Sequence, residues 1–204
     1  MLVTDDLLVE GRDLVELSLS AQRAGVTSLQ LRLKRASARE LAHAARALVQ
    51  ALHIPVLVND RPDVALAAGA AGVHLGPDDL PVALARRLAP AGFIIGASVG
   101  SESEARSAVE ADYWGIGPWR STSTKDDAGA ALEVEGFRSL RRLAGATPVL
   151  AIGGVLPEDV PIVLGEGGKG VAVASGILGS EDVENAARRY AGVVGQRGSG
   201  AAGQ

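Results

Sequence analysis

Two cations and an amide recur at alternate positions along one short segment. Gln30, Arg32 and Lys34 are spaced two residues apart in and just after Ser28–Arg32, whose pattern predicts a β-strand. Because alternate residues of a strand share a face, we expect all three side chains to point toward one side, the interior mouth of a barrel. Such a group suits a phosphate or diphosphate. Lys34 and Arg35 could instead begin a solvated loop, but Gln30 and Arg32 would be costly to bury without a partner.

Carboxylates follow the next two apolar segments. Asn59 and Asp60 end one of these segments, and Asp78 and Asp79 come after the following one. Two carboxylates and an amide beside a diphosphate clamp suit Mg²⁺, which prefers a few protein oxygens together with substrate phosphate. Turn and helix-cap roles are the alternative. We prefer that alternative for Asp78 and the metal role for Asp60 and Asp79.

Hydroxyl and glycine residues follow three later strands. The run from Ser121 to Lys125 has the composition of an anion-binding loop that could close over a substrate, although a Ser/Thr linker has the same composition. Gly153-Gly154 and Ala174-Ser175-Gly176 stand where the last two strands of a barrel commonly bind phosphate. Glycine there lets backbone amides approach the phosphate closely.

His74 lies inside an apolar segment and could act as a base. A single histidine in such a strand is more often a core residue whose hydrogen bonds are satisfied. His43 and His53 fall on or beside a predicted helix, and we assign no chemistry to them.

Short β-branched segments alternate with longer segments of helical period along the chain. The predicted strands are 2–4, 28–32, 55–59, 72–75, 93–98, 113–116, 148–152 and 170–174. The predicted helices are 13–24, 38–52, 62–68, 81–88, 102–110, 134–143 and 182–194, with Ser37 and Glu40 in capping-box relation. Eight strands that are apolar on both faces predict a single-domain (β/α)8 TIM barrel over residues 1–194. An open sheet is disfavoured because no Gly-x-Gly-x-x-Gly turn follows the first strand.

Composition excludes several classes of function. A net charge of −4 over 204 residues argues against a nucleic-acid partner, and the lack of cysteine excludes disulfides and thiolate chemistry. Residues 1–12 lack the basic and apolar regions typical of a leader, and no apolar run is long enough to span a bilayer. We therefore expect a cytoplasmic protein with small-molecule substrates and no membrane partner. A homo-oligomer is compatible with the sequence. The Gly/Ser/Ala-rich residues 195–204 are expected to form a disordered tail.

Motifs spread over nearly the whole chain resemble one family, thiamine-phosphate synthase, in its order and near its spacing. They are Gln30-Leu31-Arg32-Leu33-Lys34, Val58-Asn59-Asp60-Arg61, Gly72 to Pro81, Gly117-Pro118, Thr122-Ser123-Thr124-Lys125, Ile152-Gly153-Gly154 and Ala174-Ser175-Gly176-Ile177. The resemblance implies a (β/α)8 barrel that joins hydroxymethylpyrimidine diphosphate to thiazole phosphate or its carboxylate.

The resemblance also implies roles for individual residues. Asp60 and Asp79 would ligate Mg²⁺, and Ser98 would face the pyrimidine. The pyrimidine diphosphate would be held by Gln30, Arg32, Lys34, Asn59 and Lys125. The thiazole phosphate would be bound by Thr122, Ser123, Thr124, Gly154, Ala174 and Ser175. The residues expected to act in catalysis are Arg32, Lys34, Ser98 and Lys125. The implied mechanism is dissociative and needs no protein nucleophile or general base.

Several positions differ from the family pattern. The family usually has an acid at Leu33, a Gln near Pro77, a His at Gly100, an aromatic–Pro pair at Arg120-Ser121, an aromatic residue at Leu2 or Val3, and a Gly-Leu-rich stretch at Ala128 to Val134. The alternatives are a thiazole tautomerase of the same superfamily, whose catalytic His is missing at Gly100, and a catalytically silent phosphate-binding barrel. A phosphosugar isomerase or epimerase is a third candidate, but the acid–base pair it requires at the strand ends is not evident.

Overall fold

The strands of this chain meet in one ring. The computed structural model describes residues 1–121 and 130–195, and within them eight parallel strands pair in sequence order. They are β1 (Leu2–Val3), β2 (Leu29–Leu31), β3 (Val56–Asn59), β4 (Gly72–Leu75), β5 (Ile94–Val99), β6 (Tyr113–Ile116), β7 (Val149–Ile152) and β8 (Gly170–Ala172). A bridge between Leu2 and Val173 joins the first strand to the end of the last. The predicted (β/α)8 class is therefore confirmed.

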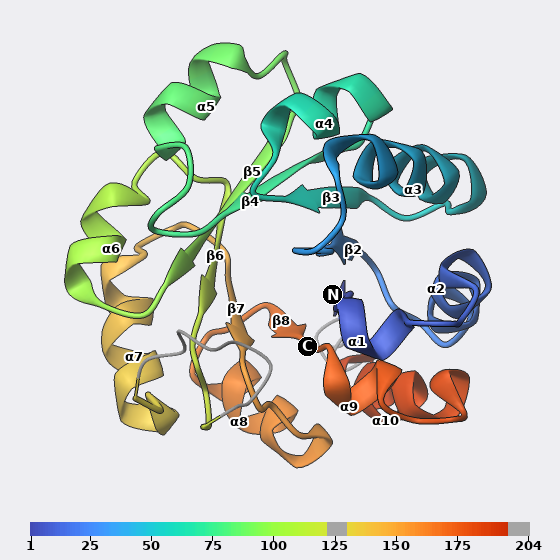
Figure 1. The fold of residues 1–204 in the computed structure, drawn as a ribbon. Coiled ribbons are helices and arrows are strands. Elements are labelled where there is room, and N and C mark those ends of the chain that lie inside the picture. Colours follow the sequence, from blue (N-terminus) through green and yellow to red (C-terminus); the bar gives the residue numbers. More distant parts are fainter. Residues whose placement is uncertain (122–129, 196–204) are drawn as a thin grey trace, which may run out of the picture.

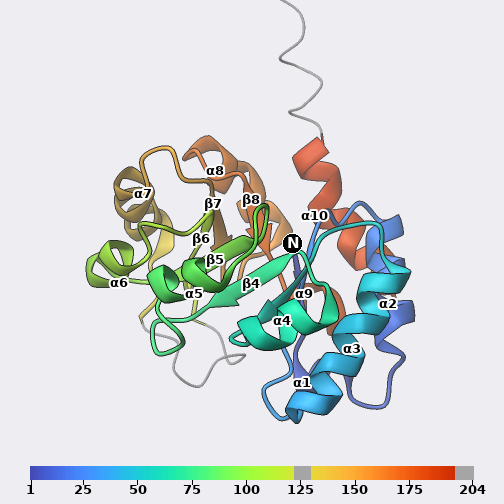
Figure 2. The ribbon, with the colours of Figure 1, turned by 90° about the horizontal axis from the view of Figure 1, so that it is seen from above.

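Helices surround the ring (Figure 1). They are α1 (Asp6–Val9), α2 (Leu14–Arg23), α3 (Ala38–Ala51), α4 (Pro62–Ala68), α5 (Val82–Leu88), α6 (Glu102–Ser107), α7 (Glu133–Leu143), the 3-10 helix η1 (Pro157–Asp159), α8 (Val160–Gly165), α9 (Ser175–Leu178) and α10 (Val183–Gly195). Seen from a second direction, α2 and α3 lie on one side of the strands and α6 and α7 on the other (Figure 2).

Local sequence sets the limits of these helices. The Asp13 carboxylate accepts hydrogen bonds from the amides of Val15 and Glu16 at 2.9 and 3.1 Å, which begins α2. Gly25 follows α2 with φ of +99°, a conformation that favours glycine. The capping box that the sequence predicts between Ser37 and Glu40 is present at the start of α3.

Side chains alternate between the two faces of each strand. Leu31, Val58 and Ile95 are buried in the core between strands and helices. Their neighbours Gln30, Asn59 and the more distant Ser98 line the cavity inside the ring. Because all strands are parallel, their carboxyl ends lie at one end of the barrel, and the inward polar residues gather there.

α1 and α8 are among the helices that were not predicted from the sequence. α1 is a single turn capped by Asp5, too short to show helical periodicity. α8 carries Pro161 near its start and ends at Gly165, and both residue types weaken a helical pattern. The predicted strand 170–174 is shorter than expected, because Ala174 is the N-cap of α9.

Parts of the sequence predictions fall outside the described residues. Thr122, Ser123, Thr124 and Lys125 belong to 122–129, and most of the predicted tail belongs to 196–204. Gly195, the first residue of that predicted tail, is the last residue of α10. Within the ranges that the structure covers, none of the helices is both long and apolar enough to cross a membrane.

Candidate active site

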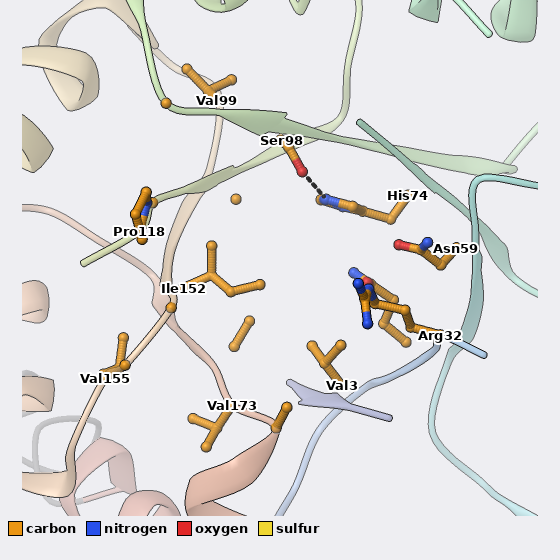
Figure 3. A pocket seen from close by; sticks show the side chains of 18 of the residues that line it. Val3, Arg32, Asn59, His74, Ser98, Val99, Pro118, Ile152, Val155 and Val173 are labelled. Atoms are coloured by element: carbon orange, nitrogen blue, oxygen red, sulfur yellow. Dashed lines mark hydrogen bonds between the residues drawn. The ribbon is translucent and has the colours of Figure 1, made fainter. Parts of the chain in front are cut away.

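A cavity of about 430 Å³ lies at the carboxyl ends of the strands. Seven of the predicted site residues line it: Gln30, Arg32, Asn59, Ser98, Gly154, Ala174 and Ser175. Figure 3 shows Arg32, Asn59 and Ser98 on one side of the cavity, with Val155 and Val173 on the other. The cavity therefore has a polar side and a side built from glycine and small apolar residues.

Arg32 is the main cation of the polar side. Its Nη1 donates to Asp5 Oδ2 at 3.1 Å, and its amide donates to Thr4 Oγ1 at 2.7 Å. Its Nε is buried and has no hydrogen-bond partner in the described part of the chain. A buried N–H without an acceptor is costly, so this donor is suited to an anion that enters the cavity.

Lys34 departs from the sequence prediction. Gln30 and Arg32 line the cavity, but Lys34 does not, and its side chain is half exposed. The reason is that β2 ends at Leu31, so the alternation of a strand does not extend to position 34. The Lys34 ammonium instead forms an ion pair with Asp60 at the edge of the cavity.

The carboxyl groups of Asp60 and Asp79 lie within reach of each other, and each affects the ionisation of the other. Burial opposes the ionisation of Asp60, but hydrogen bonds from Asp79 and Lys34 outweigh it and lower the pKa of Asp60. Burial and the adjacent Asp60 raise the pKa of Asp79, whose Oδ2 also accepts from the Gly76 amide at 2.7 Å. Of the two carboxyl groups, Asp79 therefore takes up a proton first as the pH falls.

This donor set fits a hard divalent cation. Two carboxyl groups in contact repel each other when both are ionised, and a cation removes that repulsion. Among the residues that the structure places, no cluster of three or more His, Cys, Asp or Glu side chains could hold a metal. Mg²⁺ commonly takes one or two protein carboxylates together with phosphate oxygens and water, so Asp60 and Asp79 match its requirements.

Ser98 is part of a buried hydrogen-bonded row. Its Oγ lies 3.0 Å from His74 Nε2, and His74 Nδ1 lies 2.8 Å from the hydroxyl of Tyr113 (Figure 3 shows the Ser98–His74 contact). Burial raises the pKa of Tyr113, so its phenol stays protonated. His74 is only 4% exposed and has hydrogen-bond partners, as predicted for a core histidine, yet it also lines the cavity.

The opposite side of the cavity is formed by two loops rich in glycine. Gly153 and Gly154 follow β7 with φ of +87° and +68°, and Ser175 and Gly176 begin α9 after β8. Over residues 1–121 and 130–195, the amides of Gly154, Val155, Ser175 and Gly176 have no hydrogen-bond acceptor. Free amides from two neighbouring loops form the kind of concave surface that binds phosphate.

Gly100 has no room for a side chain. A Cβ atom there would lie 2.9 Å from the Gly117 carbonyl oxygen, and the Gly100 amide donates to Glu104 at 2.7 Å. The thiazole tautomerase alternative implies a catalytic His at position 100. The backbone around Gly100 leaves no space for that side chain. The geometry gives that alternative no support.

A family model described as thiamine monophosphate synthase matches residues 1–177. The chain belongs to the thiamine-phosphate synthase family. A thiamine-phosphate synthase of Azorhizobium caulinodans is 46% identical over 198 residues, which cover 95% of this chain and 93% of that protein. One from Methanospirillum hungatei is 42% identical and covers 95% of this chain and 96% of its own length.

Solved structures agree with this assignment. A thiamine phosphate pyrophosphorylase from Pyrococcus furiosus superposes with a TM-score of 0.85 at 36% identity, covering 96% of this chain and 94% of that one. A 3-hexulose-6-phosphate synthase, with a TM-score of 0.68 and 18% identity, shares the fold alone. As a thiamine-phosphate synthase family member, the protein is an enzyme of the transferase class.

Some residues of this thiamine-phosphate synthase site were not foreseen from the sequence. Thr4, Glu104 and Pro118 line the cavity, and Tyr113 lies behind His74. Glu104 lies within the pattern of α6 and Tyr113 within that of β6. Those patterns are explained equally well by helix and strand packing, so they gave no sign of a site. Of the catalytic residues that the family resemblance implies, Lys125 lies outside the described residues.

Proposed function

We propose that this enzyme joins hydroxymethylpyrimidine diphosphate to thiazole phosphate, or its carboxylate, with Mg²⁺, giving thiamine phosphate and diphosphate. When the carboxylate is the substrate, its carboxyl group leaves as carbon dioxide. The supporting observation is one cavity with a separate place for an anion at each side. On one side is Arg32 Nε, and on the other are the amides of Gly154 and Ser175, none of which has a hydrogen-bond partner among the described residues. A reaction between two phosphorylated molecules needs both held close together in one chamber. The names of the similar proteins support the same reaction.

The polar side would bind the group that leaves. Negative charge on the diphosphate grows as its bond to the pyrimidine methylene breaks, and fixed cations stabilise that charge. Arg32 lies in the cavity wall and Lys34 at its edge, while Lys125 joins them by family resemblance. Asp60 and Asp79 would hold Mg²⁺, which supplies further neutralisation of the diphosphate when bound.

The reacting carbon needs no protein nucleophile. The carbon–oxygen bond to diphosphate breaks, the electron-rich aminopyrimidine carries the positive charge, and the thiazole nitrogen then forms the new carbon–nitrogen bond. Ser98, held by His74, would orient the pyrimidine ring, and Gly154 and Ser175 would anchor the thiazole phosphate. The enzyme's contribution is then position and charge.

The test is an assay with both precursors and Mg²⁺, in which thiamine phosphate and diphosphate are quantified by chromatography and mass. We expect both products in equal amounts, and none when either precursor is omitted. Arg32→Ala should lower the rate of thiamine phosphate formation, while its circular dichroism spectrum should match that of the wild type. Absence of product from the folded wild-type protein would refute the proposal.

A further inference from the structure

Asp159 is a buried carboxylate placed just outside the cavity. It is 2% exposed, and its two oxygens accept hydrogen bonds from both terminal nitrogens of Arg120, with Nη2 at 2.7 Å from Oδ1. Oδ2 also accepts from the amide of Leu156 at 2.8 Å. Among the described residues, Arg120 is the cation that pairs with Asp159. Leaving a buried carboxylate without a cationic partner destabilises the fold, so Asp159 needs Arg120 in this place.

Arg120 is itself fixed on the glycine turn. Its amide donates to the Gly153 carbonyl at 2.9 Å, and the preceding amide of Trp119 donates to Ile152 at 2.8 Å. A Cβ atom at Gly154 would lie 3.0 Å from Arg120 Cβ, so the arginine packs directly on the turn. Arg120 thus holds the start of the turn through its backbone and the end through Asp159.

Between these two fixed ends lie Gly154 and Val155, which line the cavity and whose amides lack an acceptor in the described ranges. Two successive glycines with positive φ can adopt many conformations, so the turn needs an outside restraint to keep one.

We propose that Arg120 and Asp159 form a positioning pair, which holds the turn from Gly153 to Leu156 so that its free amides bind the thiazole phosphate. The inference rests on the proposed function, because it names the device that shapes one of its two anion sites. Neither residue needs to touch the substrate. The pair acts by fixing the backbone that does.

The experiment compares Arg120→Ala, Arg120→Lys and Asp159→Asn with a matched control, Arg138→Ala. Arg138 also pairs through two nitrogens with a carboxylate, Glu166, at 2.7 Å for each contact, but Glu166 precedes β8 at the other end of the barrel. Steady-state kinetics would be measured for each precursor. The affinity for inorganic phosphate would be measured by calorimetry with Mg²⁺ and inorganic diphosphate saturating the polar side.

We expect Arg120→Ala and Asp159→Asn to raise the KM for thiazole phosphate and the Kd for inorganic phosphate about ten- to a hundredfold, the range found when a partner that orients a ligand is removed. The KM for the pyrimidine diphosphate should not change. Arg120→Lys, which keeps the charge but lacks the planar fork, should recover part of the loss. Arg138→Ala should lower the Tm and leave both constants unchanged.

Two results would overturn the inference. One is a lower Tm in Arg120→Ala and Asp159→Asn with both phosphate constants unchanged, since the pair would then be structural only. The other is an equal rise in the KM of both precursors. Asp159→Asn leaves no unpaired buried charge, so it answers the question if Arg120→Ala does not fold. Failure of wild-type synthesis, with Arg120-dependent phosphate binding retained, would reject the reaction and keep the positioning pair.

Discussion

Arg32 and Ser175 lie on opposite sides of the cavity and would meet phosphates that behave differently. The diphosphate gains charge as it leaves, whereas the thiazole phosphate keeps the same charge throughout. A contact that strengthens in the transition state affects the maximal rate, and one that is constant affects binding. Kinetics can therefore assign each residue to one of the two sides.

Lys125→Ala should lower kcat on the order of ten- to a thousandfold, by analogy with the removal of one oxyanion donor. Ser175→Ala keeps the amide and removes the hydroxyl. It should mainly raise the KM for thiazole phosphate, by a factor that corresponds to one hydrogen bond to a charged group, about 1.5–3 kcal/mol. Steady-state kinetics on the two variants measure both effects. If Ser175→Ala instead abolishes kcat and Lys125→Ala changes only the thiazole KM, the two sides are assigned the wrong way round.

If Asp60 and Asp79 ligate Mg²⁺, binding of the metal should depend on the substrate. With only two protein carboxylates, the free enzyme should bind Mg²⁺ weakly, and the pyrimidine diphosphate should strengthen binding because its oxygens complete the coordination. Isothermal titration with and without that substrate measures the difference. Equal Mg²⁺ affinity in both titrations, or full activity of Asp60→Ala, would remove Asp60 from the metal site.

Single residues also show how far the sequence could be interpreted. Gln30, Arg32 and Asn59 line the cavity, as could be predicted. Polar side chains inside strands are costly to bury in the apolar core, so they are expected to face a polar site. Lys34 was placed wrongly, since the strand ended before it. Tyr113 and Asp159 could not be found, because their roles depend on His74 and Arg120, which are distant in sequence.

At the scale of elements, α7 connects the fold to the active site. Phe137 of α7 is fully buried and packs edge-on against Trp119, with ring centroids 5.6 Å apart. Trp119 immediately precedes Arg120, and its amide is bonded to the end of β7. The packing of one helix thus supports the segment that covers the glycine turn.

Phe137→Ala should lower the free energy of unfolding by about 3–5 kcal/mol, because it removes a large buried aromatic side chain and leaves a cavity. Leu143→Ala, at the exposed end of the same helix, is the control and should stay within about 0.5 kcal/mol of wild type. Urea unfolding measures both. Similar values for the two variants would contradict the role given to Phe137.

Elements with a clear period were predicted best. The limits of α4, β4 and β6 match those predicted, and α3 differs by one residue because its capping box marks the start. The misses include α1, which is one turn long, and α8, whose proline and glycine resemble loop residues. Neither carries enough periodic residues for a helical signal, and only tertiary packing makes them helical.

At the scale of the whole molecule, ligand binding and stability are linked. The cavity draws its walls from strands along almost the entire chain, from Val3 to Ala172. A ligand that bridges these walls binds the folded state and not the unfolded chain. Binding should therefore raise the stability of the whole barrel.

Inorganic diphosphate with Mg²⁺, at about one hundred times its Kd, should raise the free energy of unfolding by about 2.7 kcal/mol. Unfolding can be followed by the fluorescence of Trp114 and Trp119, which are both 3% exposed. Arg32→Ala should show a smaller increase at the same ligand concentration. An increase identical to that of the wild type would place the diphosphate elsewhere.

The bridge between Leu2 and Val173 has a consequence for how the chain folds. Every other strand pairing joins neighbours in sequence, whereas this one, with the Val3 amide 2.9 Å from the Val173 carbonyl, joins two ends of the barrel chain. Contacts of such long sequence separation form late, after local units have condensed. In a chevron analysis, Leu2→Ala should therefore accelerate unfolding and leave the refolding rate nearly unchanged. Ring closure would then govern how long the native enzyme persists.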